Sequence, residues 1–197
     1  MHFFVLTDEE ENPDEKFWPE GYKKVINAEV TKVIFDQFIR RRSFVKTYLT
    51  HYSSTYKEYT EFIASLAHIV AIGAENGTDE IFDEIYSIPE HNAYLPKIRK
   101  YARYLWPMVL TKDLESGIEY VVISEYRQEK TYSSTYEQDY KYLFRDFNEF
   151  LVYIAKLVTV GAVNGADDAL GKIYQAFLKQ EELPTIRRRP RRLKLLN

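Results

Sequence analysis

The chain repeats itself at long range. Shifting the sequence by 88 residues aligns 17–104 with 105–192 without a gap and gives 23 identities in 88 positions. Trp18-Pro19 then falls on Trp106-Pro107. A period of this length indicates two copies of one structural unit. We therefore expect a pseudo-dimer within one polypeptide, its halves related by a pseudo-twofold axis.

The repeat also predicts the domain organisation. We expect an N-terminal strand and acidic linker in 1–16, repeat unit 1 in 17–104, repeat unit 2 in 105–192, and the end of a basic C-terminal tail in 193–197. A unit of 88 residues is close to the size at which a lone hydrophobic core is marginal. The two units should therefore pack against each other.

Each unit is predicted to begin with a β-hairpin. Met108–Thr111 and Ile118–Tyr126 are rich in β-branched and aromatic residues and flank a segment that contains Gly117. The equivalent runs in the first unit are Tyr22–Ile26 and Val30–Phe35. Met1–Leu6 resembles one additional strand.

Two helices should follow each hairpin. Apolar residues at i, i+3 and i+4 spacing run through 52–70 and 140–158, which is typical of an amphipathic helix. The predicted fold class is therefore α+β, a tandem duplication of an 88-residue ββαα unit that is rich in helix.

A Gly-Ala-x-Asn-Gly-x-Asp box follows the first helix of each unit. Glycine is suited to the left-handed residue that ends a helix, and asparagine caps the next one. The alternative is an anion site at a helix N-terminus, which the aspartate of the box disfavours by occupying the positive helix end. The box is therefore predicted to be structural; its residues are Gly73, Asn76, Gly77, Asp79, Gly161, Asn164, Gly165 and Asp167.

Residue types limit the chemistry. The chain has no cysteine, which excludes disulfides, thiolate zinc sites and a cysteine nucleophile. Its four histidines show no metal-ligand spacing, and no phosphate-binding loop or nucleophile elbow is present. Glu119, Glu125 and Lys130 resemble a loose metal-nuclease set, but the first unit has no equivalent. We predict no cofactor and no metal site, and we favour a protein that is not an enzyme.

Localisation is predicted from what the sequence lacks. Its longest apolar stretches fall short of roughly 20 residues, and the N-terminus runs from a short apolar segment straight into acidic residues. We expect a soluble cytoplasmic or intracellular protein without membrane contact. A location inside a virion is compatible with this expectation.

Basic residues gather late in each unit. Net charge is −3, yet residues 183–197 hold six Lys or Arg and no acid. A solvated connector and tail explain such clusters, but arginine favours phosphate and carboxylate partners. The candidate nucleic-acid-binding residues are Arg99, Arg103, Arg187, Arg188, Arg189, Arg191, Arg192 and Lys194.

The sequence favours a non-enzymatic binding or assembly module. Its two units would present two related surfaces to a macromolecular partner, either another protein or further copies of the chain, and tethered sites gain affinity through effective concentration. One alternative is DNA or RNA binding through the basic connectors and tail. A second is a small enzyme with one degenerate repeat.

Overall fold

The protein is built from helices. The computed structural model describes residues 20–87, 108–128 and 130–185, and every regular element in these ranges is helical. The first half contains α1 (Glu20–Phe38), α2 (Arg42–Thr47), the π-helical turn η2 (Tyr48–Tyr52) and α3 (Tyr59–Ser87). The second half contains α4 (Met108–Gln128), α5 (Lys130–Thr135), the π-helical turn η3 (Tyr136–Tyr140) and α6 (Phe147–Lys179).

The predicted α+β class and the ββαα unit are wrong, because the fold is all-α. Tyr22–Ile26 and Val30–Phe35, predicted as strands, lie in α1, and the two predicted strands of the second unit lie in α4. The buried residues explain the error. In α1 every fourth residue is buried, which makes one helical stripe: Ile26, Val30, Ile34 and Phe38. The strand predicted for Met1–Leu6 lies outside the described residues.

The helices of the two halves correspond at the shift of 88 residues. The elements α1, α2, η2 and α3 begin at residues 20, 42, 48 and 59, and their counterparts begin at 108, 130, 136 and 147. Each difference is 88. The division into two repeat units at residue 104, and a common origin of the halves, stay predictions.

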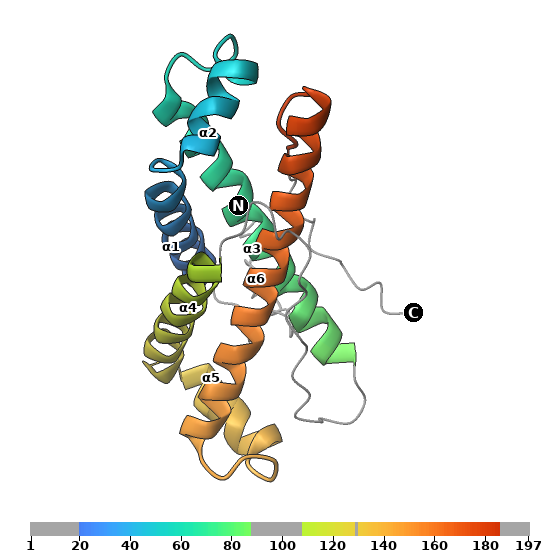
Figure 1. The fold of residues 1–197 in the computed structure, drawn as a ribbon. Helices are drawn as coiled ribbons and strands as arrows, with labels where there is room; N and C mark the ends of the chain where they lie inside the picture. Colours follow the sequence, from blue (N-terminus) through green and yellow to red (C-terminus); the bar gives the residue numbers. More distant parts are fainter. Residues whose placement is uncertain (1–19, 88–107, 129, 186–197) are drawn as a thin grey trace, which may run out of the picture.

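The long helices α3 and α6 cross at the centre of the molecule (Figure 1). Helix α1 packs on α3, α4 packs on α6, and α1 also contacts α4. The short elements α2 and α5 lie at opposite ends of the molecule, each next to the beginning of a long helix (Figure 1).

The glycine box does not end a helix, which corrects the sequence interpretation. It lies inside α3 and α6, which both continue unbroken through it. A Cβ added at Gly73 would lie 2.5 Å from the carbonyl oxygen of Gly165, and one added at Gly161 would lie 2.6 Å from the Cα of Thr78. The glycines are therefore the points where two helix backbones touch, in the manner of small-residue packing motifs.

The crossing is antiparallel and nearly symmetric. Gly73 meets Gly165, and Gly77 meets Gly161. Since Gly161 and Gly165 are the counterparts of Gly73 and Gly77 at the 88-residue shift, each contact is repeated with the partners exchanged. That exchange is the property of an interface built on a twofold axis.

The polar residues of the box do not cap helices either. Asn76 and Asp79 lie in the middle of α3, and Asn164 and Asp167 are buried in α6. Next to them, the Thr78 hydroxyl donates to the carbonyl oxygen of Ala74 at 3.0 Å and lies 3.4 Å from that of Val158 on α6. This buried hydroxyl links the two crossing helices.

Only α6 among the described helices is long and apolar enough to cross a bilayer. This helix is longer than the apolar stretches considered in the sequence. However, 78% of its most apolar stretch is buried inside the protein, so its length and composition are weak evidence for a membrane span.

Candidate binding surfaces

Two helical tips lie at opposite ends of the molecule (Figure 1). The first tip comprises residues 42–58, and the second comprises residues 130–146. Each consists of a six-residue α-helix, a five-residue π-helical turn and a loop that leads into a long helix. π-Helical turns are rare and are frequent at functional sites. Here two of them occur at equivalent positions.

An aromatic cluster holds each tip to its long helix. In the first tip, the ring centroids of Tyr48 and Tyr52 lie 5.7 and 5.1 Å from that of Phe62. In the second tip, those of Tyr136 and Tyr140 lie 5.7 and 4.9 Å from that of Phe150. Offset and tilted ring pairs of this kind are worth about 0.5–1.5 kcal/mol beyond burial of their area.

Stacked rings at the base of each tip add to this cluster. Phe38 and Phe44 stack with centroids 4.3 Å apart, and the equivalent Tyr126 and Tyr132 stack at 3.8 Å.

Burial raises the pKa of Tyr140, and the nearby carboxylate of Asp139 adds to the rise. A neutral phenol therefore persists inside the second tip.

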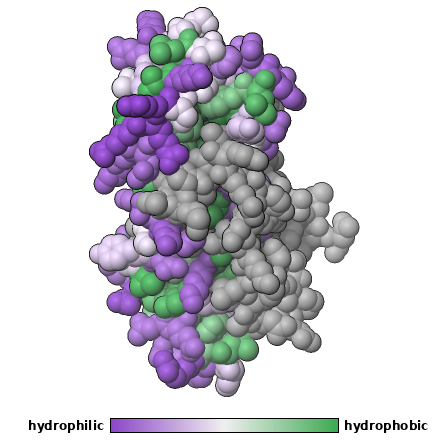
Figure 2. Space-filling view, viewed as in Figure 1, coloured by the Kyte–Doolittle hydropathy of each residue, from purple (hydrophilic) through white to green (hydrophobic). Residues whose placement is uncertain are grey.

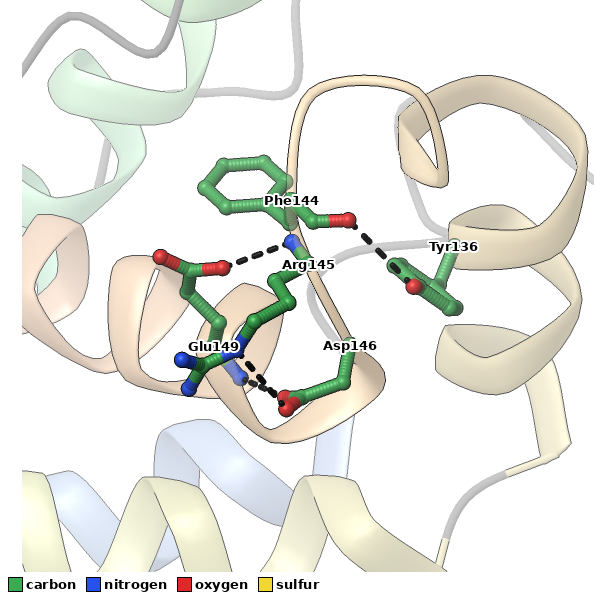
Figure 3. Close-up of polar contacts among 5 residues, drawn as sticks. All are labelled: Tyr136, Phe144, Arg145, Asp146 and Glu149. Carbon is green, nitrogen blue, oxygen red and sulfur yellow. Dashed lines mark hydrogen bonds and ion pairs between the residues drawn. The ribbon is translucent and has the colours of Figure 1, made fainter.

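Hydrogen bonds fix the loop of each tip. The Tyr136 hydroxyl donates to the carbonyl oxygen of Phe144 at 3.4 Å, and Asp146 caps α6 by accepting from the backbone N–H of Glu149 at 2.9 Å (Figure 3). The Glu149 carboxylate accepts in turn from the backbone N–H of Arg145 at 2.6 Å. The result is a reciprocal arrangement that resembles a capping box.

The glutamates at the starts of the two long helices play the same part in both tips. Glu61 accepts a hydrogen bond from the backbone N–H of Lys57 at 3.0 Å, as Glu149 does from that of Arg145. These glutamates therefore hold the tip loops in place.

The two tips share a scaffold but expose different side chains. In the first tip Leu49 is 65% exposed, and its counterpart in the second tip is Glu137. In the second tip Tyr142 is 88% exposed and Leu143 is also exposed, where the first tip has Ser54 and Thr55. Figure 2 shows hydrophobic side chains among hydrophilic ones at both ends of the molecule.

A third surface, the acidic groove, lies beside the helix crossing. It consists of two adjoining cavities of about 470 and 290 Å³, which share Asp168, Lys172 and Pro184 in their walls. Gly73, Gly77 and Gly165 line the smaller cavity. Among the described residues, one lysine and five acidic residues line the groove: Lys172, Glu80, Asp167, Asp168, Glu181 and Glu182.

The chain turns back along α6 to form one wall of this groove. Gln180 ends α6 in the left-handed conformation, at φ 58° and ψ 33°. The N–H of Gln180 bonds the carbonyl of Phe177, and that of Glu181 bonds the carbonyl of Ala176, which is a Schellman motif. The hydroxyl of buried Tyr52 donates to the carbonyl oxygen of Glu181 at 3.0 Å. Pro184 and Thr185 then line the cavity above the glycine crossing.

The candidate residues of the sequence divide into two groups. The structural box is gathered at the crossing, where Gly73, Asn76, Gly77 and Gly165 line the groove and Asp167 lies in its wall. The other group lies outside the described residues: Arg99, Arg103, Arg187, Arg188, Arg189, Arg191, Arg192 and Lys194. Of the loose metal-nuclease set, Glu119 and Glu125 lie on α4 and Lys130 begins α5.

Sequence reasoning missed both the tips and the groove. No simple sequence pattern predicts a π-helical turn. The only signal in the sequence is that Tyr48 and Tyr52 recur 88 residues later as Tyr136 and Tyr140. In the described ranges, no group of three His, Asp or Glu side chains is arranged to hold a metal ion. Comparisons with protein-family models, curated proteins and solved structures find no match to this chain.

Proposed function

We propose that this chain is a binding or assembly module whose two tips contact a macromolecular partner, another protein or further copies of the chain. The observation that carries the proposal is the pair of π-helical tips at opposite ends. Both have the same internal scaffold, and the first exposes Leu49 whereas the second exposes Tyr142 and Leu143. Exposed aromatic and aliphatic side chains on a rigid support are typical of contact residues.

The crossing supports this role by fixing the tips relative to each other. The backbones of α3 and α6 are in contact, and protein interiors are close-packed. The two helices therefore have little room to shift against each other. Two contacts held at a fixed separation act as a bivalent ligand. If both are engaged, loss of one lowers the apparent affinity by roughly 10²- to 10⁴-fold.

Variants of the exposed tip residues test the proposal. We would compare wild type, Leu49→Ser and the double variant Tyr142→Ser/Leu143→Ser in affinity capture from the native source, with sedimentation of the purified proteins to detect self-association. Tyr120→Ser is the matched control, because Tyr120 is 75% exposed but lies on α4. Both tip variants should lose the captured or self-associated partner, whereas the control should retain it.

Two outcomes would contradict the proposal. Capture that is equal in all four proteins would show that the tips are not the contact surfaces. Capture that survives both tip changes but disappears after nuclease treatment would favour the alternative of DNA or RNA binding through the basic residues.

A further inference from the structure

We propose that the acidic groove is the docking site of the chain's own arginine-rich segment, Arg187–Lys194. This inference concerns a different surface from the tips and goes beyond the proposed function. It is carried by the charges of the groove, by the course of the chain at the end of α6, and by the shape of the groove.

The charges of the groove and of the segment are complementary. Among the residues that the structure describes, three exposed carboxylates, those of Asp168, Glu181 and Glu182, and one lysine line the groove, while Glu80 and Asp167 lie in its walls with interaction partners of their own. The segment that follows it in the sequence holds six Lys or Arg and no acid: Arg187, Arg188, Arg189, Arg191, Arg192 and Lys194. Arginine binds carboxylates through two parallel hydrogen bonds, which favours it over lysine at such a surface.

The course of the chain brings the segment to the groove. The Schellman motif at Gln180 reverses the direction of the chain, and the Tyr52 hydroxyl holds the carbonyl of Glu181. Thr185 already lines the smaller cavity, two residues before Arg187. A ligand tethered by so short a linker has an effective concentration in the mM range, so weak individual contacts suffice.

The groove also has the shape for arginine side chains. Its cavities of about 470 and 290 Å³ are lined partly by glycine and alanine: Gly73, Gly77, Gly165, Ala169, Gly171 and Ala176. Carboxylates from α3, α6 and the following turn lie around this apolar floor. Arginine places its aliphatic stem on apolar surface while its guanidinium reaches charged groups.

Docking has a consequence for polyanionic partners. A segment that occupies the groove withholds six cations from phosphate groups, so a nucleic acid must displace it from the carboxylates before binding. The groove then acts as an intramolecular competitor.

Spin labels on the full-length chain test the proposal. The sequence has no cysteine, so Gln175→Cys and Leu195→Cys introduce a unique pair, one in the groove wall and one just beyond the segment. Pulsed electron spin resonance should show a short-distance population at low salt. Raising the salt to about 1 M shortens the screening length to about 3 Å and should reduce that population at least fivefold.

Charge reversal supplies the matched comparison. Asp168→Lys, Glu181→Lys and Glu182→Lys change three exposed groove residues and should reduce the short-distance population at least fivefold. Asp36→Lys, Asp113→Lys and Glu125→Lys change the net charge equally at exposed positions elsewhere and should leave it intact. Unchanged circular dichroism in both triple variants would show that the fold is retained.

Two results would overturn the proposal. One is a distance distribution that responds neither to salt nor to reversal of the groove charges. The other is a broad, salt-insensitive distribution while an added oligoarginine peptide binds the groove, which would assign the groove to a basic segment of another protein.

Discussion

Placing a methyl group at Gly165 should destabilise the fold, although the same change usually stabilises a helix. An added Cβ would collide with the carbonyl oxygen of Gly73 and would lie 2.8 Å from the backbone nitrogen of Gly77. Both atoms are backbone, so they cannot rotate away. The helices α3 and α6 must therefore separate.

The expected magnitude follows from that separation. Ordinary contact needs about 3.4 Å, so the crossing must open by more than about 1 Å, which forfeits at least about half of each dispersion contact. If roughly 30 atom pairs each lose about half of a well of about 0.15 kcal/mol, the loss is about 2 kcal/mol. Replacing glycine by alanine within a helix returns about 1 kcal/mol. The predicted net destabilisation is about 1–2 kcal/mol.

Gly171→Ala is the matched control. Gly171 lies in the same helix, but no atom of the described residues lies within 4 Å of a Cβ built there, so this change should stabilise by about 0.5–1 kcal/mol. Both variants would be unfolded in urea and followed by circular dichroism. If Gly165→Ala were as stabilising as Gly171→Ala, the helices would not be in backbone contact and the reasoning would be refuted.

Three further predictions concern stability. Gln180→Gly should stabilise by about 1 kcal/mol because glycine adopts the left-handed conformation of this helix end without strain; an unchanged urea midpoint would contradict that geometry. Thr159→Val should stabilise by about 1 kcal/mol, since the buried Thr159 hydroxyl finds no hydrogen-bond partner among the described residues. Thr78→Val should destabilise because the bonded Thr78 hydroxyl is lost, and equal effects of the two changes in thermal unfolding would argue against this assignment. Burial, with a smaller contribution from Tyr140, raises the pKa of Tyr153 to about 12 from 10.0, so the stability that this phenol contributes is present below pH 10 and is lost as the pH rises toward 12. Tyr153→Phe should therefore flatten the loss of stability between about pH 10 and about pH 12, and an unaltered slope in urea unfolding would contradict the shift.

The sequence predicted part of the helical structure and missed the rest for physical reasons. The i, i+3, i+4 pattern located α3 and α6 correctly over 59–70 and 147–158. The predicted hairpins were wrong because the β-branched residues of these segments were interpreted as evidence for strands. In α1 the spacing of Ile26, Val30 and Ile34 was the stronger signal, since burial of every fourth residue is helical.

The glycine box shows why local signals were insufficient. Glycine ends helices when the chain must turn, but it is tolerated inside a helix where a second backbone approaches closely. The spacing of Gly73 and Gly77, repeated in Gly161 and Gly165, places both glycines of each pair on one helix face and is a packing signal. The groove could not be predicted, because its acidic side chains come from segments that only the crossing brings together.

The antiparallel crossing of α3 and α6 is the central claim, and one distance comparison tests it most directly. Spin labels at His68→Cys and Lys172→Cys, both exposed, lie at nearly the same level of the crossing, whereas a label at Lys156→Cys lies further along α6. With a rise of 1.5 Å per residue, Lys172 and Lys156 differ in level by about 24 Å. The account predicts that the label pair at 68 and 172 is clearly closer than the pair at 68 and 156. The reverse order, or equal distances, would contradict it.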